Sequence, residues 1–174
     1  MSHEKPSNAV SSSILSTQFA SELGMLSRSP PVLITTLKPC PRGTNGGVSA
    51  WGLFVSLAGG VLVGTSAAVT LYLENSVCRD HVERGLPFWA VVIGIGAWSG
   101  LVGSLIDSVL GATLQQSLYS TTRRRIVHSN DATDKDDKVV NVPGSGFNIL
   151  SNNGVNLMSA AATAMAVIWW ARPL

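Results

Sequence analysis

The sequence has few charged residues and few cysteines, and each shortage narrows the class of protein. Only 13% of its 174 residues are charged, whereas a soluble domain usually carries about a quarter. The formal net charge of +2 is too small to indicate a nucleic-acid partner. Cys40 and Cys78 are the only cysteines and form no pattern typical of zinc. No Walker, nucleophile-elbow or HExxH pattern occurs, so these signatures of common enzyme classes are absent.

The charges are also unevenly spaced and leave three long apolar runs. Residues 51–73 are apolar or small, which is long enough to span a membrane with some tilt. The second run covers residues 86–107, where Pro87 favours the first turn of a helix. The third run, residues 154–171, is near the lower limit for a spanning helix. None of them alternates in polarity, so strands are not expected. The sequence therefore predicts an all-α, multi-pass membrane protein with about three transmembrane helices.

Polar segments lie between the predicted helices. Residues 1–50 form a polar N-terminal segment that ends in a glycine-rich turn, and residues 108–153 form a loop on the same side of the membrane. Within that loop, residues 121–141 have almost no apolar content, so disorder is expected there. Four aspartates in this stretch suggest a calcium loop, but the glycine that such a loop needs is missing. A solvated charge run is the preferred interpretation.

The basic residues predict how the chain is oriented. Three lie on one side of the predicted membrane, at Arg79, Arg84 and Arg172. The other nine lie on the side of the N-terminal segment and the loop, at Lys5, Arg28, Lys38, Arg42, Arg123, Arg124, Arg125, Lys135 and Lys138. The positive-inside rule places the N-terminus in the cytosol or stroma. Residues 1–24 lack the apolar core and cleavage pattern of a secretory signal. The sequence leaves three membranes open: that of a plastid, the endoplasmic reticulum or the plasma membrane.

Small residues recur along the predicted helices. Gly60 and Gly64 form one Gly-xxx-Gly pair, and Gly96 and Gly100 form another. In lipid such pairs let helix backbones approach closely, where dispersion contacts replace the missing hydrophobic driving force. The third helix offers Ser159 and several alanines. We predict that the three helices pack on each other; the alternative is that the small residues only make the helices flexible.

Asp107 is the only charge in residues 85–122. A carboxylate in lipid costs roughly 2.5 to 3.5 kcal/mol at a helix centre on insertion scales, and less near the edge. An acid in this position is therefore a functional candidate by default. The alternative is a hydrated residue at a helix end.

Three polar motifs are expected to face a common aqueous side. They occupy residues 41–47 before the first helix, 107–113 at the end of the second, and 148–156 at the start of the third. Two membrane crossings separate the first motif from the second, and none separates the second from the third. We therefore expect one site at this membrane surface.

These motifs carry the residue types that bind phosphate and metal. A glycine-rich turn can present backbone N–H groups to phosphate oxygens, and a helix start adds its positive dipole end. Asp107 is the candidate catalytic residue and metal ligand, with Glu22 as a second carboxylate, because Mg²⁺ takes one or two carboxylates plus substrate phosphates. The candidate phosphate- and nucleotide-binding residues are Lys38, Arg42, Gly43, Thr44, Asn45, Gly46, Gly47, Asn152 and Asn153. An ordinary turn and a helix N-cap at Asn152 are the structural alternatives.

Residues 33–48 read Leu-Ile-Thr-Thr-Leu-Lys-Pro-Cys-Pro-Arg-Gly-Thr-Asn-Gly-Gly-Val. This stretch resembles a motif of the transmembrane protein nineteen/PGR family of integral membrane proteins. Residues 100–115 and 149–157 resemble its next two motifs, in the same order, and the resemblance covers about residues 19–171. It implies further spanning helices before this region and a Gly-Asp-Thr where this chain has Ser16-Thr17-Gln18. The chain thus resembles the C-terminal half of a family member.

The resemblance also implies a function. Phytyl-phosphate kinase of tocopherol synthesis is a distant member of this family. An intact relative would use Mg²⁺ to transfer a phosphoryl group from CTP to a polyprenyl or phytyl monophosphate, mainly by positioning and charge neutralisation. The expected partners are membrane lipids, an isoprenoid phosphate and other subunits of a homo- or hetero-oligomer. The alternatives are a non-catalytic membrane protein in sugar-responsive signalling and, third, a transporter in which Asp107 relays ions.

Overall fold

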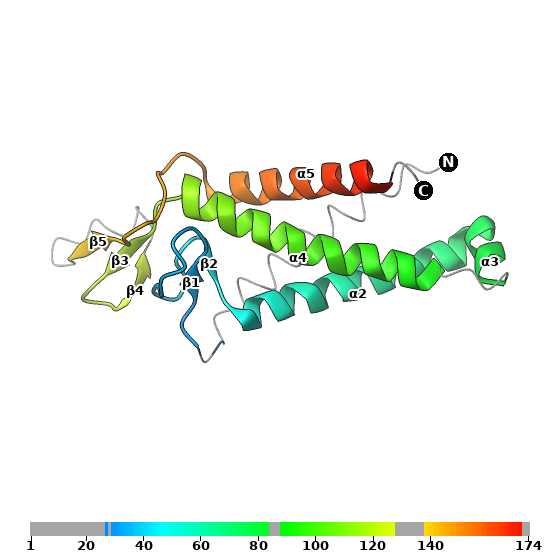
Figure 1. The fold of residues 1–174 in the computed structure, drawn as a ribbon, viewed down its shortest axis with the longest axis horizontal. Coiled ribbons are helices and arrows are strands. Elements are labelled where there is room, and N and C mark those ends of the chain that lie inside the picture. The colour runs from blue at the N-terminus through cyan, green and yellow to red at the C-terminus, as the bar shows by residue number, and fades with distance from the viewer. Residues whose placement is uncertain (1–26, 28, 84–87, 128–137, 172–174) are drawn as a thin grey trace.

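The computed structural model describes residue 27 and residues 29–83, 88–127 and 138–171. Within this part of the chain, long helices lie side by side and short strands gather at one end of them (Figure 1). This arrangement places two connections at the strand end: the one before the first long helix, and the one that joins the second long helix to the third.

The helices run back and forth along the long axis of the molecule (Figure 1). Helix α2 (Ala50–Glu74) leads away from the strands, and the short α3 (Ser76–Glu83) lies at the far end. Helix α4 (Phe88–Leu114) returns to the strands, and α5 (Asn152–Ala171) leads away again. Helix α4 contacts α2 on one side and α5 on the other. It therefore forms the centre of the described bundle.

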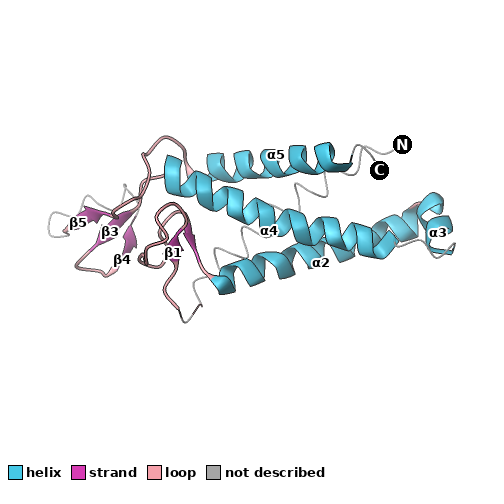
Figure 2. Ribbon diagram, in the orientation of Figure 1, coloured by secondary structure: helices cyan, strands magenta, loops and turns pink. Residues whose placement is uncertain are grey.

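The strands form two small antiparallel sheets in the connections (Figure 2). Strand β1 (Val32–Leu33) pairs with β2 (Gly47–Val48). Strand β3 (Leu118–Ser120) lies between β4 (Arg125–Val127) and β5 (Val139–Asn141). The prediction of an all-α fold is thus correct for the apolar runs but misses these strands. Residues 121–141, predicted to be disordered, contain β4 and β5; residues 128–137 between them lie outside the described part.

Helices α2 and α4 are long and apolar enough to cross a membrane, at 25 and 27 residues. In an apolar stretch of 18 residues in each helix, only 33% of the residues of α2 and 28% of those of α4 are buried within the described structure. Most of their apolar side chains are therefore exposed or only partly buried, which suits helices that face lipid. Helix α5 has 20 residues and is not among the described helices that meet this criterion, because its first two turns carry Asn152, Asn153 and Asn156.

Two helix boundaries differ from the sequence prediction. Helix α2 lies within one residue of the predicted span at each end, but α4 continues seven residues past Asp107 to Leu114. A single half-buried carboxylate does not end a helix whose next turns, 108–114, are still small and apolar. Helix α5 starts at Asn152 rather than at Gly154, because the Ser151 hydroxyl caps its first turn by accepting from the Gly154 N–H at 3.3 Å.

Helices α2 and α4 pack on each other at the predicted glycines. A Cβ atom built on Gly96 would lie 2.5 Å from the carbonyl oxygen of Gly60, and one on Gly100 would lie 2.6 Å from that of Ser56. A Cβ on Gly60 would in turn meet the Gly96 carbonyl. Only glycine allows this approach, so the close-packing role predicted for both Gly-xxx-Gly pairs is confirmed.

Candidate functional site

The glycine-rich turn is stabilised mainly by its own backbone. The Thr44 N–H and hydroxyl donate to the Pro41 carbonyl at 3.2 and 2.7 Å, and the Gly47 N–H donates to the Thr44 carbonyl at 2.9 Å. Gly43 and Gly46 have φ angles of +83° and +79°, a region that other residues enter only at a cost. The N–H groups of Thr44 and Gly47 thus donate to carbonyls within the turn. Fewer backbone N–H groups are left for the phosphate oxygens that the sequence predicted would bind there.

The same turn docks against the end of α4. The Asn45 N–H donates to the buried Ser117 hydroxyl at 2.9 Å, and the Asn45 side chain donates to the Gln116 carbonyl at 3.2 Å. Gly46 lies directly against Ala112, where a Cβ atom would overlap it. The turn and the second motif are therefore in contact, and the sequence contained no local sign that Gln116 and Ser117 join them.

The segment before α5 closes the C-terminal end of α4. The Phe147 N–H donates to the Thr113 carbonyl at 3.2 Å, and the N–H groups of Ile149 and Leu150 donate to the Leu114 carbonyl at 3.0 and 3.2 Å. These bonds satisfy carbonyls that a helix end leaves without intrahelical partners. They also fix the start of α5 beside the end of α4, so the third motif lies at the same end of the molecule as the other two (Figure 1).

Asp107 lies in α4 one helical turn before Gly111, where the glycine turn approaches the helix. Its half-buried carboxylate accepts a long hydrogen bond from the Ser159 hydroxyl of α5, at 3.3 Å. Ser159 shares that proton with the Asn156 carbonyl at 3.0 Å. The carboxylate therefore faces α5, and the oxygen atoms around it are of the type that Mg²⁺ prefers.

Exposed cations surround the strand end of the molecule. Lys38 and Arg42 are exposed on the connection between β1 and β2. Arg123 and Arg124 are exposed in the turn between β3 and β4, and Arg125 is exposed at the start of β4. A Cβ on Gly43 would be 3.6 Å from the Ile126 side chain, so the two connections are neighbours. This positive surface suits phosphate groups of lipids or of a soluble ligand.

Cys40 belongs to a small core beneath this surface, with Leu33 and Ala112. Burial raises the pKa of the Cys40 thiol above its usual value, although a hydrogen bond with Thr44 acts in the opposite direction. The thiol is therefore neutral near pH 7 and packs as a small apolar side chain. Both cysteines are free.

The structure brings some of the predicted site residues together, places others nearby at the same end, and does not describe one of them. Asp107 and the glycine turn lie within one turn of α4, joined through Gly111. Asn152 and Asn153 are exposed on the first turn of α5 at the same end. Glu22, the second predicted carboxylate, lies outside the described residues. Among the described residues no group of three His, Cys, Asp or Glu side chains is placed to hold a metal. At the strand end of the molecule Asp107 is the one acidic side chain that the described residues offer.

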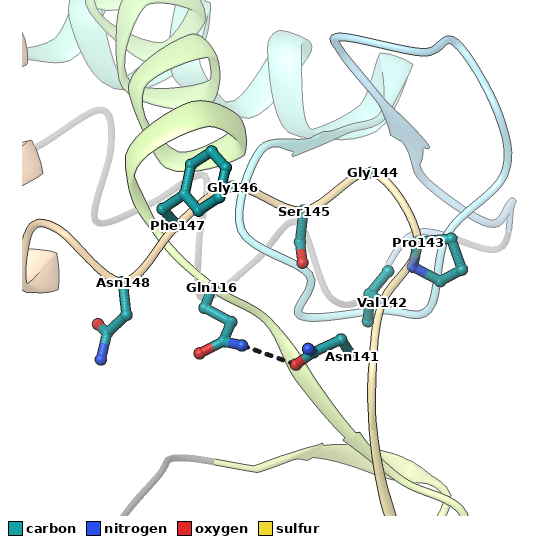
Figure 3. Close-up of a pocket in the computed structure, with 9 residues that line it drawn as sticks. All are labelled: Gln116, Asn141, Val142, Pro143, Gly144, Ser145, Gly146, Phe147 and Asn148. Atoms are coloured by element: carbon teal, nitrogen blue, oxygen red, sulfur yellow. Dashed lines mark hydrogen bonds between the residues drawn. The ribbon is translucent and has the colours of Figure 1, made fainter.

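A half-open pocket beside the glycine turn was not predicted from the sequence. It is lined by Gln116 and residues 141–148 (Figure 3). Gln116 donates from its side chain to the Asn141 side-chain oxygen at 2.8 Å. The Pro-Gly-Ser-Gly stretch at residues 143–146 reads locally as an ordinary turn, and only the fold brings it against the end of α4.

Comparison with known proteins identifies the family. Residues 9–164 match the family described as "Integral membrane protein DUF92". The chain belongs to this family. Membership of DUF92 establishes that α2 and α4 belong to an integral membrane protein and confirms the family resemblance found in the sequence motifs.

Two similar proteins are longer than the part of them that this chain matches. It is 42% identical to Protein PGR of Arabidopsis thaliana over 146 residues, 84% of this chain and 47% of that protein. It is 30% identical to an uncharacterized membrane protein of Methanocaldococcus jannaschii over 101 residues, 58% of this chain and 36% of that protein. The chain therefore spans less than half the length of these relatives. No solved structure gives a significant match.

Proposed function

We propose that this chain forms the membrane-surface half of a CTP-dependent kinase for an isoprenoid monophosphate, such as phytyl or polyprenyl phosphate. One observation carries the proposal. Asp107, an acid in an apolar helix, lies one turn from the contact with the glycine turn, and its carboxylate meets Ser159 of α5. In the proposed function, an acid so placed would lie where a lipid phosphate at the membrane surface meets a soluble donor.

In this proposal the cationic side chains bind phosphate and Asp107 binds the metal. Lys38 and Arg42 would bind and orient phosphate oxygens, and their charge would favour the phosphoryl group as it transfers. The hydroxyl of Ser159 would hold the Asp107 carboxylate in place. Mg²⁺ fits this set of oxygen atoms, with Asp107 as its carboxylate ligand, and when bound it would neutralise phosphate charge. Asn152 and Asn153 would hydrogen-bond the donor or the lipid head group.

The topology proposed with this function has three crossings, by α2, α4 and α5. Residues 29–49, 115–127 and 138–151 then face the same aqueous side, which the excess of basic residues assigns to the cytosol or stroma. Helix α5 would cross because its buried Ser159 and Thr163 face α4 while its exposed Met165 and Trp169 face lipid. The membrane is that of a plastid, the endoplasmic reticulum or the cell surface.

The test uses the purified chain in lipid nanodiscs, and in parallel Protein PGR, with phytyl monophosphate, Mg²⁺ and CTP. We expect phosphoryl transfer that Asp107→Asn, or its counterpart in the relative, lowers by at least about 100-fold, since a transition-state charge contact is lost. Asp80→Asn, an exposed acid on α3 at the far end, is the matched control and should retain full activity. The proposal is overturned if neither protein forms product, or if Asp107→Asn leaves the rate unchanged.

A non-catalytic membrane subunit is the second candidate, including one that acts in sugar-responsive signalling. Two observations favour it. The turn amides of Thr44, Asn45 and Gly47 donate within the protein, and α2 exposes Phe54 and Leu62 at 58% and 62%, a surface that would suit another helix. A stable membrane partner that co-purifies with a chain unable to bind nucleotide would favour this candidate.

A further inference from the structure

The pocket beside the end of α4 has the size and chemistry of a small-molecule site. Its volume is about 520 Å³, and ligand pockets usually measure about 300 to 1,000 Å³. The described side chains that line it carry no charge. Its polar groups are the amides of Gln116, Asn141 and Asn148 and the hydroxyl of Ser145. Such a lining suits a neutral, hydrogen-bonding ligand.

The side-chain amides that line the pocket offer a ligand both a hydrogen-bond donor and a hydrogen-bond acceptor. The bond from Gln116 Nε2 to Asn141 Oδ1, at 2.8 Å, sets the orientation of both side chains. It leaves Gln116 Oε1 as an acceptor and Asn141 Nδ2 as a donor. Figure 3 shows the Asn148 and Gln116 amides near one another and the Phe147 ring apart from them, beside Gly146. A flat ring between them would meet amides at its edge and an aromatic surface beside it, as nucleobases do.

The backbone of the pocket is fixed before any ligand binds. The Val142 N–H donates to the Ser117 carbonyl and the Ser145 N–H to the Val142 carbonyl, both at 3.0 Å. The Phe147 N–H is held by the Thr113 carbonyl. Gly146 approaches that same carbonyl so closely that no Cβ would fit. A pocket ordered in advance loses little conformational entropy when it binds a ligand.

The pocket also adjoins the connection between β1 and β2, which carries Lys38 and Arg42. A Cβ on Gly144 would lie 3.1 Å from the Leu33 side chain and 3.2 Å from that of Thr36. Thr36 is two residues from the exposed Lys38. A ligand with a neutral ring and a charged tail can therefore place the ring among the amides and direct the tail toward positive charge. Nucleotides have this division, and the exposed Phe147, 76% accessible, is placed to contact the base.

We propose that Gln116, Asn141, Phe147 and Asn148 bind the nucleobase of a nucleotide. The inference rests on the proposed function for the nature of the ligand, but it assigns base recognition to residues outside the three motifs that suggested that function, apart from Asn148. It divides the nucleotide between two surfaces: the base contacts the neutral pocket, and the phosphates extend toward Lys38 and Arg42.

The test measures equilibrium binding of CTP and of tripolyphosphate to the full chain in nanodiscs. We expect CTP to bind the wild type more tightly than tripolyphosphate. Asn148→Ala removes an exposed amide for which no hydrogen bond is described, and Phe147→Leu removes the ring but keeps an apolar side chain. Each should weaken CTP binding by at least about tenfold, within the range of base stacking and hydrogen-bond losses, and leave tripolyphosphate binding unchanged.

Two controls separate base recognition from other roles of these residues. Phe147→Tyr keeps an aromatic ring and should keep the affinity for CTP. Phe54→Leu removes a ring that is 58% exposed on α2 and should have no effect. If Phe147 only anchors the chain in the membrane interface, Phe147→Leu will bind CTP as the wild type does.

The outcomes distinguish this inference from the proposed function. Equal affinities for CTP and tripolyphosphate, or CTP binding that Asn148→Ala and Phe147→Leu leave unchanged, would overturn the pocket assignment while a kinase remained tenable. Base-dependent binding without phosphoryl transfer would support the pocket and overturn the kinase. A chain that binds no CTP would overturn both.

Discussion

At the scale of single residues, Gly46 joins the glycine turn to the apolar helix α4. Its φ of +79° and its contact with Ala112 each require glycine. We expect Gly46→Ala to destabilise the fold by roughly 2 to 4 kcal/mol, from backbone strain together with overpacking. The measurement is unfolding in mixed detergent and SDS, followed by tryptophan fluorescence.

Gly43→Ala is the matched control at the same scale. Gly43 has a similar φ, +83°, but a Cβ there would meet only Ile126 at an ordinary 3.6 Å. Gly43→Ala should be destabilised by backbone strain alone, without overpacking. Gly46→Ala should therefore be less stable than Gly43→Ala by roughly 1 to 3 kcal/mol. Equal losses would show that the contact between Gly46 and Ala112 contributes nothing.

The sequence pointed to Gly46 for a different reason. A Gly-rich turn before a helix indicates backbone N–H groups that can hold an anion, and this led to the phosphate prediction. The structure instead shows the Asn45 N–H bound to Ser117 and Gly46 packed on Ala112. Those partners are distant in the sequence, and a turn motif alone cannot reveal which distant residues will use its amides.

At the scale of elements, the pairing of α2 with α4 depends on backbone contact. Gly96→Ala would place a Cβ 2.5 Å from the Gly60 carbonyl oxygen, whereas at Gly94 nothing lies within 4 Å. We expect Gly96→Ala to cost roughly 1 to 3 kcal/mol. Gly94→Ala should be neutral or slightly stabilising, because alanine favours helix by up to about 1 kcal/mol. The measurement is the free energy of unfolding of the two variants in SDS. Similar stabilities would argue against glycine-mediated packing.

Helices were more predictable than strands for a physical reason. Residues 51–73 are uniformly apolar, and that composition alone determined the extent of α2 to within one residue at each end. Strands such as β4 and β5 have three residues each and form only by pairing with β3. Their charged neighbours dominated the local composition, so Ile126 and Val139 gave too little signal to predict strands.

At the scale of the whole molecule, the account depends on where its polar ends lie. The glycine turn, the end of α4 and the start of α5 share one end of the bundle, and α3 lies at the other (Figure 1). The apolar runs and the order of the motifs predicted this arrangement. They could not predict the pocket at residues 141–148, because its walls come from segments that only the fold brings together.

The most direct test is labelling of single cysteines by a membrane-impermeant reagent in sealed vesicles, in a Cys40→Ala, Cys78→Ser background. Suitable exposed positions are Thr35, Thr122 and Asn148 at the strand end and Ser76 at the far end. The account predicts that Thr35→Cys, Thr122→Cys and Asn148→Cys are labelled from the same side of the membrane, and Ser76→Cys only from the other. Labelling of Thr35→Cys and Asn148→Cys from opposite sides would contradict it, because the three motifs would then have no common surface on which to form a site.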